Sequence, residues 1–389
     1  MRKTLSVTMS ATFLVTTLAG AALAQAEPSA VPSASPLPAA SSSPLPDAMP
    51  PMPGFVDARW RKLNPERGPD AREDHTWTVD AAGDYAYLFG GRDGGKEYDD
   101  LWRYDLATDT WKKLKPDGRA PSARFGHSTV WVDGVGLVVF AGQQGVDFFN
   151  DLWAYDPERN RWKLLPDRGQ TPRKRYGSCA VVGADGKLKI SHGFTFAGRF
   201  DDTRAYNFAN ERWTDVSPDG RRPGPRCLHD CFTSSAGQLV LYGGQNDDES
   251  ALGDLWATRP NDNWKRGPEP RPRARRLYAV TEAGPNAFIF GGAGANDDVL
   301  DDLLRVDRET LEMMRVRTTG PSPSGRSAGT LITDAKRGRL LLFAGKAKVA
   351  KADLWQLTER PAAEGPGSDD AAAPSPLESP VSQEDEQAA

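Results

Sequence analysis

Arginine and aspartate recur at a regular spacing and could form either ion pairs or a site for a carboxylate ligand. An arginine opens each of six similar segments: Arg72, Arg124, Arg175, Arg226, Arg276 and Arg326. An aspartate follows each of them: Asp100, Asp151, Asp202, Asp254, Asp302 and Asp353. A ring of guanidinium groups could hold carboxylates through paired hydrogen bonds. Because the two sets match in number, we favour ion pairs within the scaffold for the ring as a whole.

Histidines are the second group that could do chemistry. His75, His127 and His229 each stand three residues after their arginine, where the other segments have Ser178, Ala279 and Gly329. Three imidazoles near one axis could bind a metal ion, but a strand histidine hydrogen-bonded to its surroundings is the commoner case. We therefore predict no metal and no cofactor. His192 is different, because the other segments have only glycine or alanine at its position.

The third segment departs most from the others, between Gly193 and Phe200. Three phenylalanines and an arginine replace polar residues there, and such a group suits a sugar ring or a peptide side chain. A loop folded onto its own phenylalanines is the alternative. Arg175 and Arg226 would add positive charge, which favours an anionic ligand. The predicted ligand-binding residues are His192, Phe194, Phe196, Arg199, Phe200, Arg175, Arg226 and His229. No catalytic residue is assigned.

Cysteine usage indicates one disulfide and one free thiol in an oxidising compartment. Cys179 lies four residues after Arg175, and Cys231 lies five after Arg226. This opposite parity would point the two thiols at each other across adjacent segments. Cys227 with Cys231 is the competing pair, and the sequence alone leaves both open.

These residues sit in a repeat with a period near 50. Small-residue pairs such as Gly90-Gly91 and Gly243-Gly244 end the second apolar run of most segments, and Asp-Leu-Trp begins the third. A tryptophan marks the fourth run, each 51 residues after the last: Trp60, Trp111, Trp162, Trp213 and Trp264. Met313 takes that position in the fifth segment. Four short strands per segment cannot bury their own apolar faces, so the segments must pack together as propeller blades.

The glycine pair, the third-strand aromatic and the spaced tryptophan resemble the kelch repeat. The resemblance implies an all-β fold: a single six-bladed kelch-type β-propeller with four-stranded antiparallel blades over residues 54–360. The sixth segment stops after Leu354-Trp355-Gln356-Leu357, while Trp60 belongs to a fourth strand that has no preceding three. An N-terminal outer strand should therefore close the ring and remove its free edges.

The two ends of the chain have the composition of export and tether segments. Residues 1–26 combine a basic start, an apolar run and small-x-small sites, which is typical of a secretory signal peptide. Residues 27–53 are rich in Pro, Ala and Ser and predict an extended linker. Residues 361–389 form an acidic tail that we expect to be disordered. We expect a periplasmic or secreted protein without membrane insertion.

Charge and motifs limit the function. Two of the 49 basic residues lie in the signal segment and nine of the 53 acidic residues lie in the linker and tail, so the core is near neutral. That balance gives no basis for nucleic-acid binding. We predict a monomeric binding module for a protein or carbohydrate ligand, on the face formed by the second-to-third-strand loops. The alternative is a sugar-acid epimerase or mutarotase, because exported sialic acid mutarotases resemble it in fold; His192 and His229 would then be acid–base groups.

Overall fold

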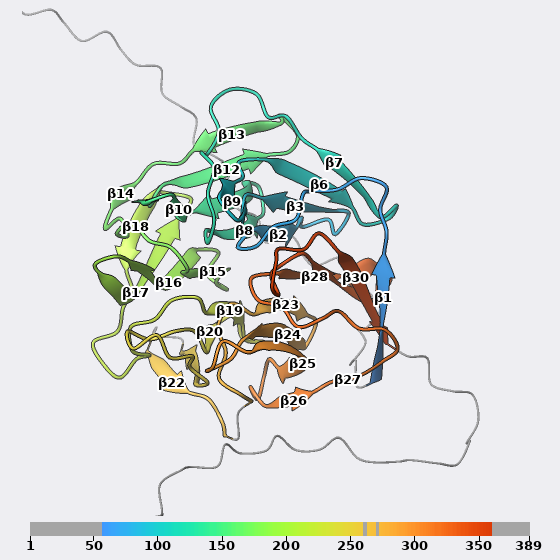
Figure 1. Ribbon diagram of the computed structural model, residues 1–389. Helices are drawn as coiled ribbons and strands as arrows, with labels where there is room; N and C mark the ends of the chain where they lie inside the picture. Colours follow the sequence, from blue (N-terminus) through green and yellow to red (C-terminus); the bar gives the residue numbers. More distant parts are fainter. Residues whose placement is uncertain (1–56, 260–262, 270–271, 360–389) are drawn as a thin grey trace, which may run out of the picture. The chain divides into compact units, whose positions relative to one another are not determined.

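The protein is a ring of six small β-sheets around a central channel (Figure 1). The computed structural model describes residues 57–259, 263–269 and 272–359. Within this part the only helix is one short 3-10 turn, Ala335–Arg337, and no helix is long and apolar enough to cross a membrane. The predicted signal peptide, linker and acidic tail lie outside the described residues.

Each blade has four antiparallel strands, which follow one another from the channel outward. The innermost strands are β2 (Thr76–Val79), β8 (Ser128–Val132), β15 (Cys179–Val182), β19 (Asp230–Thr233), β23 (Ala279–Ala283) and β28 (Thr330–Asp334). The second strands are β3 (Tyr85–Phe89), β9 (Gly136–Phe140), β16 (Leu188–Thr195), β20 (Leu239–Tyr242), β24 (Asn286–Ala293) and β29 (Arg339–Phe343). The third strands are β6 (Leu101–Asp105), β12 (Leu152–Asp156), β17 (Gly198–Asn207), β21 (Leu255–Thr258), β25 (Val299–Asp307) and β30 (Leu354–Glu359). The outermost strands are β7 (Thr110–Lys113), β13 (Arg161–Leu164), β18 (Arg212–Asp215), β22 (Trp264–Arg266), β26 (Met313–Arg315) and β1 (Asp57–Leu63).

Shorter strands complete the sheets and the loops. β14 (Arg168–Gly169) and β27 (Arg317–Thr319) pair in parallel with the outer strands β18 and β1. Two hairpins are formed by loops between second and third strands: β4 (Arg92–Asp93) with β5 (Lys96–Glu97), and β10 (Gln143–Gln144) with β11 (Asp147–Phe148).

The burial of side chains depends on the position of the strand in its blade. Every residue of β9 is buried, as expected for a strand covered by blades on both faces. In β13 only Trp162 is buried, because one side of an outer strand faces solvent. Gly134, with φ at 72°, makes the tight turn between β8 and β9, a conformation that glycine adopts without a Cβ clash.

The regularly spaced tryptophans fill the gaps between blades, as the sequence predicts. Trp111 and Trp162 lie opposite Tyr104 and Tyr155 on the third strands, with ring centroids 4.7 and 5.2 Å apart. Met313 occupies the same place in blade 5, opposite Val306. These aromatic pairs are buried, so they stabilise the contacts between blades rather than bind a ligand.

The N-terminal strand closes the ring, which confirms the prediction. β1 pairs antiparallel with β30 from Ala58–Glu359 to Leu63–Leu354 (Figure 1). Trp60 in this strand is buried and contacts the ring of Phe290 in blade 5. Blade 6 is therefore built from both ends of the described chain, and its third strand has no free edge.

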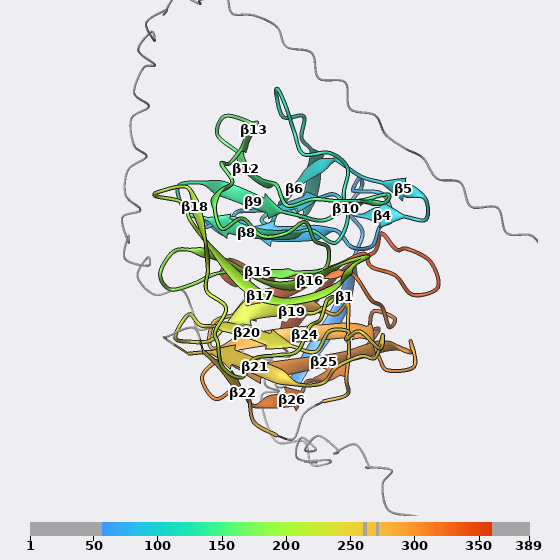
Figure 2. The ribbon, with the colours of Figure 1, turned by 90° about the vertical axis from the view of Figure 1, so that its left-hand side faces the viewer.

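One face of the propeller carries the six loops between the second and third strands, and we call it the loop face. Figure 2 shows the β4–β5 hairpin extending from this side. Contacts join neighbouring loops: Gly145 N–H donates to Glu97 Oε1 at 2.8 Å, and Arg199 lies 3.3 Å from Asp247 Oδ1. The loop face is thus a continuous surface around one end of the channel.

Candidate functional site

Six buried arginines hold the loop face together, and this confirms the scaffold interpretation of the ring. Arg124 is typical: its Nη1 donates to Ala141 O at 2.9 Å and to Asp151 Oδ1 at 2.7 Å, while Nη2 donates to Asp151 Oδ2 at 3.0 Å. Arg175 and Arg226 make the same contacts with Asp202 and Asp254. Both guanidinium groups are buried and bonded to their aspartates, so they act in the scaffold of the loop face.

We call the six Arg–Asp pairs the frame, and in it the pKa values of Asp100, Asp202, Asp254 and Asp353 lie below the ordinary value. Burial acts to raise the pKa of Asp202, but the hydrogen bonds and charge of Arg175 outweigh it and the pKa falls below its ordinary value. In four blades a tryptophan also donates its indole N–H to the aspartate, as Trp153 does to Asp151 at 2.7 Å. In blade 3 Arg204 takes that role at 3.0 Å, which explains the departure from Leu-Trp seen in the sequence.

The arginine of blade 5 is Arg275, not Arg276. Arg275 is buried and pairs with Asp302, whereas Arg276 reaches the loop face and pairs with Asp297. The position three residues after the arginine is therefore Tyr278 rather than Ala279. Pro272 stands three residues before Arg275, the spacing that every other blade follows.

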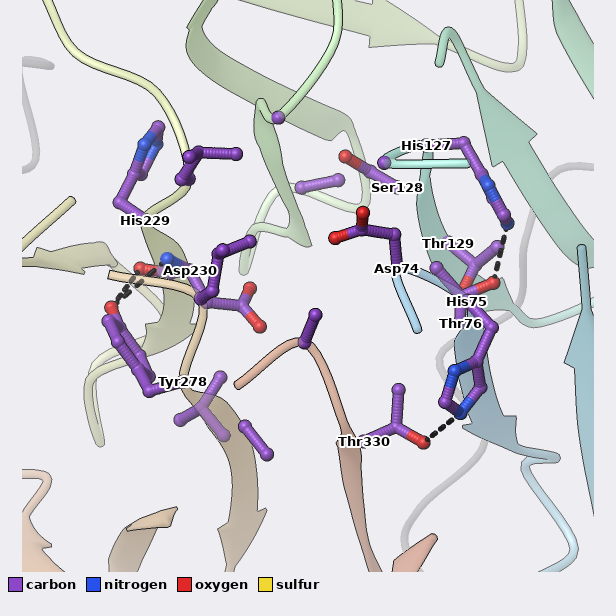
Figure 3. A pocket seen from close by; sticks show the side chains of 18 of the residues that line it. Asp74, His75, Thr76, His127, Ser128, Thr129, His229, Asp230, Tyr278 and Thr330 are labelled. Atoms are coloured by element: carbon purple, nitrogen blue, oxygen red, sulfur yellow. Dashed lines mark hydrogen bonds between the residues drawn. The ribbon is translucent and has the colours of Figure 1, made fainter. Parts of the chain in front are cut away.

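The three repeat histidines lie around the channel without converging on one point (Figure 3). His75 Nε2 lies 2.8 Å from Thr330 Oγ1, and His127 Nε2 lies 2.8 Å from Thr76 Oγ1. Each of these contacts joins neighbouring blades. Burial lowers the pKa of His127 to about 3, and it lowers the pKa values of His75 and His229 well below the ordinary range. These imidazoles are neutral at physiological pH and act in packing.

His192, one of the predicted ligand-binding residues, lies in the interior of the protein. Its Nδ1 lies 2.6 Å from Ser191 Oγ, its Nε2 lies 3.4 Å from Pro223 O, and its ring contacts that of His229. The side chain is completely buried. Burial, helped by the charge of Arg226, lowers its pKa to about 3. His192 therefore lacks solvent access, and the lowered pKa values of His192 and His229 leave both imidazoles weakly basic.

The blade 3 loop places its aromatic residues on the loop face. Phe194 and Phe196 pack edge-to-face on each other and on Phe148 of blade 2, with ring centroids 4.9 to 6.3 Å apart. Phe196 remains 68% exposed. Phe200 is partly buried beneath the Arg175 guanidinium at 4.7 Å, so it belongs to the frame. The loop thus both packs on its own phenylalanines and leaves one of them free for a partner.

Arg199 is already engaged by neighbouring side chains. Its Nη2 donates to Gln245 Oε1 at 3.0 Å and its Nη1 to Asp247 Oδ1 at 3.3 Å, both from the blade 4 loop. Three consecutive acids, Asp247 to Glu249, lie exposed in that loop. The predicted positive site for an anionic ligand over blades 3 and 4 is therefore largely compensated by acidic side chains.

Exposed apolar side chains gather on the loop face. Within the described part of the chain, six large apolar residues are exposed, and four belong to these loops: Val146, Phe196, Val299 and Val349. Val146, Phe196 and Val349 are the most exposed, at 75, 68 and 69%. The loops of this face differ in charge. The blade 6 loop carries three basic residues, Lys346, Lys348 and Lys351, whereas the blade 4 loop carries three acidic residues.

The mouth of the channel is encircled by a closed ring of backbone hydrogen bonds. One residue from each blade donates its N–H to the carbonyl of the preceding blade, at 2.7 to 3.0 Å: Asp74, Gly126, Gly177, Leu228, Leu277 and Ala328. All six have positive φ, between 53 and 63°. Four are not glycine, so the inter-blade bonds hold a conformation that L-residues seldom adopt.

A cavity of about 240 Å³ lies at this mouth, and two carboxyl groups line it (Figure 3). Burial raises the pKa of Asp74 to about 6 against the opposing charge of Arg92, and it raises the pKa of Asp230 to about 7. Sequence reasoning did not single out Asp74 or Tyr278, and it gave Asp230 no role of its own. Alignment of the corrected blades reveals both acids, since no other blade has an acidic residue at either position.

The cysteines pair across adjacent blades. Cys179 of β15 and Cys231 of β19 form a disulfide with their Cα atoms 5.6 Å apart, while Cys227 is free and buried. This is the first of the two pairings considered from the sequence. Burial also raises the pKa of the Cys227 thiol, which makes it a poor nucleophile.

Comparison with known proteins agrees with this architecture. Residues 55–238 and 216–360 match the KLHDC2/KLHL20/DRC7 Kelch-repeats domain. Kelch domain-containing protein 10 of Homo sapiens is 27% identical over 289 residues, which cover 68% of this chain and 64% of that protein. Kelch domain-containing protein 3 of Bos taurus is 28% identical over 294 residues, covering 67% and 74%. The chain therefore spans slightly less than two thirds of the first of these relatives. Kelch-repeat propellers commonly mediate protein interactions, and this chain belongs to the kelch-repeat family that the matched domain defines.

Proposed function

We propose that this protein is an exported binding module that recognises a protein partner on its loop face. The observation that carries the proposal is that three strongly exposed apolar side chains, Val146, Phe196 and Val349, all lie on loops of this one face. Large exposed apolar side chains distributed over one face favour a partner that extends across that face. They lie beside Lys348 of blade 6 and the acids of blade 4, which gives the face a charge polarity that a partner can match.

A protein fits this surface better than a carbohydrate. Sugar rings stack on flat, exposed aromatic faces. Here Phe148, Phe194 and Phe196 pack edge-to-face on one another, so only the tip residue Phe196 is open. The three apolar tips come from blades 2, 3 and 6, and a partner that contacts all of them must extend across the face. The preferred partner is basic over blade 4 and acidic over blade 6.

Export is supported by the N-terminal sequence and by the Cys179–Cys231 disulfide. Disulfides persist in the periplasm and outside the cell, and they are rare in the reducing cytosol. Fractionation of cells that produce the full chain tests this part of the proposal. We expect the mature form, cleaved within about ten residues of position 26, outside the cytoplasmic fraction; uncleaved protein in the cytosol would contradict export.

Crosslinked capture from envelope and extracellular fractions tests the binding surface. The loop-face variant replaces Val146, Phe196 and Val349 with serine. The matched control replaces Leu164 and Met314, exposed apolar residues of the outer strands β13 and β26, with serine. We expect a protein that wild type and control both capture and that the loop-face variant loses. Equal capture by all three forms would contradict the placement.

A further inference from the structure

The cavity at the channel mouth is lined by all six blades and has an unusual charge. Its lining residues include two carboxyl groups, Asp74 and Asp230, and no lysine or arginine. The three histidines that also line it are neutral, because burial lowers their pKa values. The cavity therefore offers negative charge without a basic group in its own wall.

Many other polar groups of the wall are bonded to one another, although ring nitrogens of His75, His127 and His229 have no partner. The six backbone N–H groups of the mouth ring donate to six carbonyls of the same ring. Thr76 and Thr330 contact His127 and His75, and Ser128 Oγ donates to Ser178 O at 2.7 Å. The Tyr278 hydroxyl donates to backbone carbonyls and accepts from Asp230 N–H at 3.0 Å. Besides the unpaired ring nitrogens of the neutral histidines, the two carboxyl groups are the groups of the wall that can carry charge and accept further hydrogen bonds.

The two carboxyl groups approach the cavity from different sides, as Figure 3 shows. Asp230 Oδ1 accepts one hydrogen bond, from Cys231 N–H at 2.8 Å, and no ion pair to its carboxylate is found in the described structure. Asp74 is only 8% exposed, and Arg92 Nη2 lies 2.8 Å from its Oδ2, so the charge of Asp74 is largely compensated. The partly exposed Asp230 carboxylate has no such partner, and a carboxylate of this kind attracts a cation that can donate hydrogen bonds.

We propose that the channel mouth is a binding site for a primary ammonium group, which contacts Asp230 and lies beside Asp74. An ammonium donates three hydrogen bonds and suits oxygen acceptors, while its methylene stem can contact Leu228, Leu277 and Ala328 in the rim. A divalent metal ion fits less well, because no cluster of three metal-binding side chains occurs among the described residues. The ammonium can belong to a free alkylamine or to a lysine side chain. The inference does not depend on the protein partner proposed above.

Titration calorimetry with defined probes tests this site. The probes are n-butylammonium chloride, a capped Gly-Lys-Gly peptide, n-butanol as the neutral analogue, and calcium chloride, all at one ionic strength and at pH 8. We expect saturable binding of n-butylammonium and none of n-butanol. Asp230→Asn should weaken binding at least about tenfold, as expected for a lost charge-assisted hydrogen bond. Asp74→Asn should weaken it less, because Arg92 already compensates that charge.

Two controls make the outcome unambiguous. Asp93→Asn removes an exposed carboxylate from the same face and should leave the affinity unchanged. Thermal melting should show that Asp230→Asn remains folded, so that lost binding is not lost structure. Binding of the lysine peptide as well as butylammonium would assign the site to a protein side chain, and binding of butylammonium alone would assign it to a free amine. Equal affinity of wild type and Asp230→Asn, or calcium binding tighter than amine binding, would overturn the proposal.

Discussion

The Cys179–Cys231 disulfide gives a stability prediction that can be calculated from the chain. It joins inner strands of blades 3 and 4 across a sequence separation of 52 residues. Closing a loop of this length in the unfolded chain removes entropy equivalent to about 4 kcal/mol at 25 °C. Spread over roughly 300 ordered residues, that corresponds to a fall of about 6 °C in melting temperature when the bond is reduced.

The assay compares oxidised and reduced wild-type protein in urea, with melting temperature as a second readout. Reduction leaves every side chain in place, so the comparison avoids the cavity that an alanine substitution would create. Cys227→Ala should respond to the reductant as the wild type does, because Cys227 is outside the bond. A wild-type midpoint that does not change on complete reduction, verified by thiol counting, would refute this reasoning.

Three further predictions follow from the frame, the closure and the channel. Deleting residues 55–64 removes β1 with its buried Trp60 and exposes the edge of β30. We therefore expect aggregation or a large fall in melting temperature. A variant that melts like the wild type would contradict the closure of the ring by β1. Arg124→Ala should lower the free energy of unfolding by about 3–5 kcal/mol, because it leaves Asp151 without its partner. Arg159→Ala removes an exposed ion pair with Asp156 and should change the free energy of unfolding by less than about 1 kcal/mol; equal effects in urea unfolding would argue against the frame. Asp230→Asn should raise the free energy of unfolding at pH 8 by up to about 4 kcal/mol. Folding raises the pKa of Asp230 to about 7, so ionising this carboxyl as the pH rises from about 4 to 7 destabilises the folded protein, and asparagine does not ionise. That gain should vanish at pH 4, and urea melts at both pH values measure it; a gain that does not depend on pH would exclude the charge as its cause.

The repeat made the fold predictable from the sequence. Five blades repeat the tryptophan, three have a Gly-Gly pair and all six have the Arg–Asp pair, so an error in one copy is corrected by the others. The repeat also predicted how the ring closes. The sixth segment ends near Leu357 without a fourth strand, and the strand around Trp60 has no preceding three, so the two together make one complete blade. Strand alternation was consistent with the observed Cys179–Cys231 pairing, because alternate residues face opposite neighbours, but the sequence left Cys227 with Cys231 open as well.

The site was harder to predict because it depends on contacts between blades. Arg275 and Arg276 are adjacent and chemically identical, and only the distance from Pro272 distinguishes the buried one. His192 breaks the repeat, yet its partners Ser191 and Pro223 hold it inside the protein. A break in the pattern shows that a position is special, but burial decides whether a ligand can reach it.

The sequence also did not predict that the charge of Arg199 is compensated by an acidic side chain. Arg199 meets Asp247 from the next loop, 48 residues away in the chain, and no local pattern predicts that contact. Asp74 and Asp230 could have been found by aligning the start of each inner strand, but only after blade 5 was placed in the correct register. Their common cavity becomes evident only when the blades are arranged around the channel.

The affinity of the captured partner for the loop-face variant tests the central claim most directly. Dissociation constants should be measured for wild type, for the variant with serine at Val146, Phe196 and Val349, and for the control with serine at Leu164 and Met314. Loss of three exposed apolar contacts should weaken binding by at least about tenfold, because contact residues at an interface typically contribute about 1 kcal/mol or more each where they matter. The control should bind as the wild type does. Unchanged affinity of the loop-face variant, or an equal loss in the control, would show that the partner binds elsewhere.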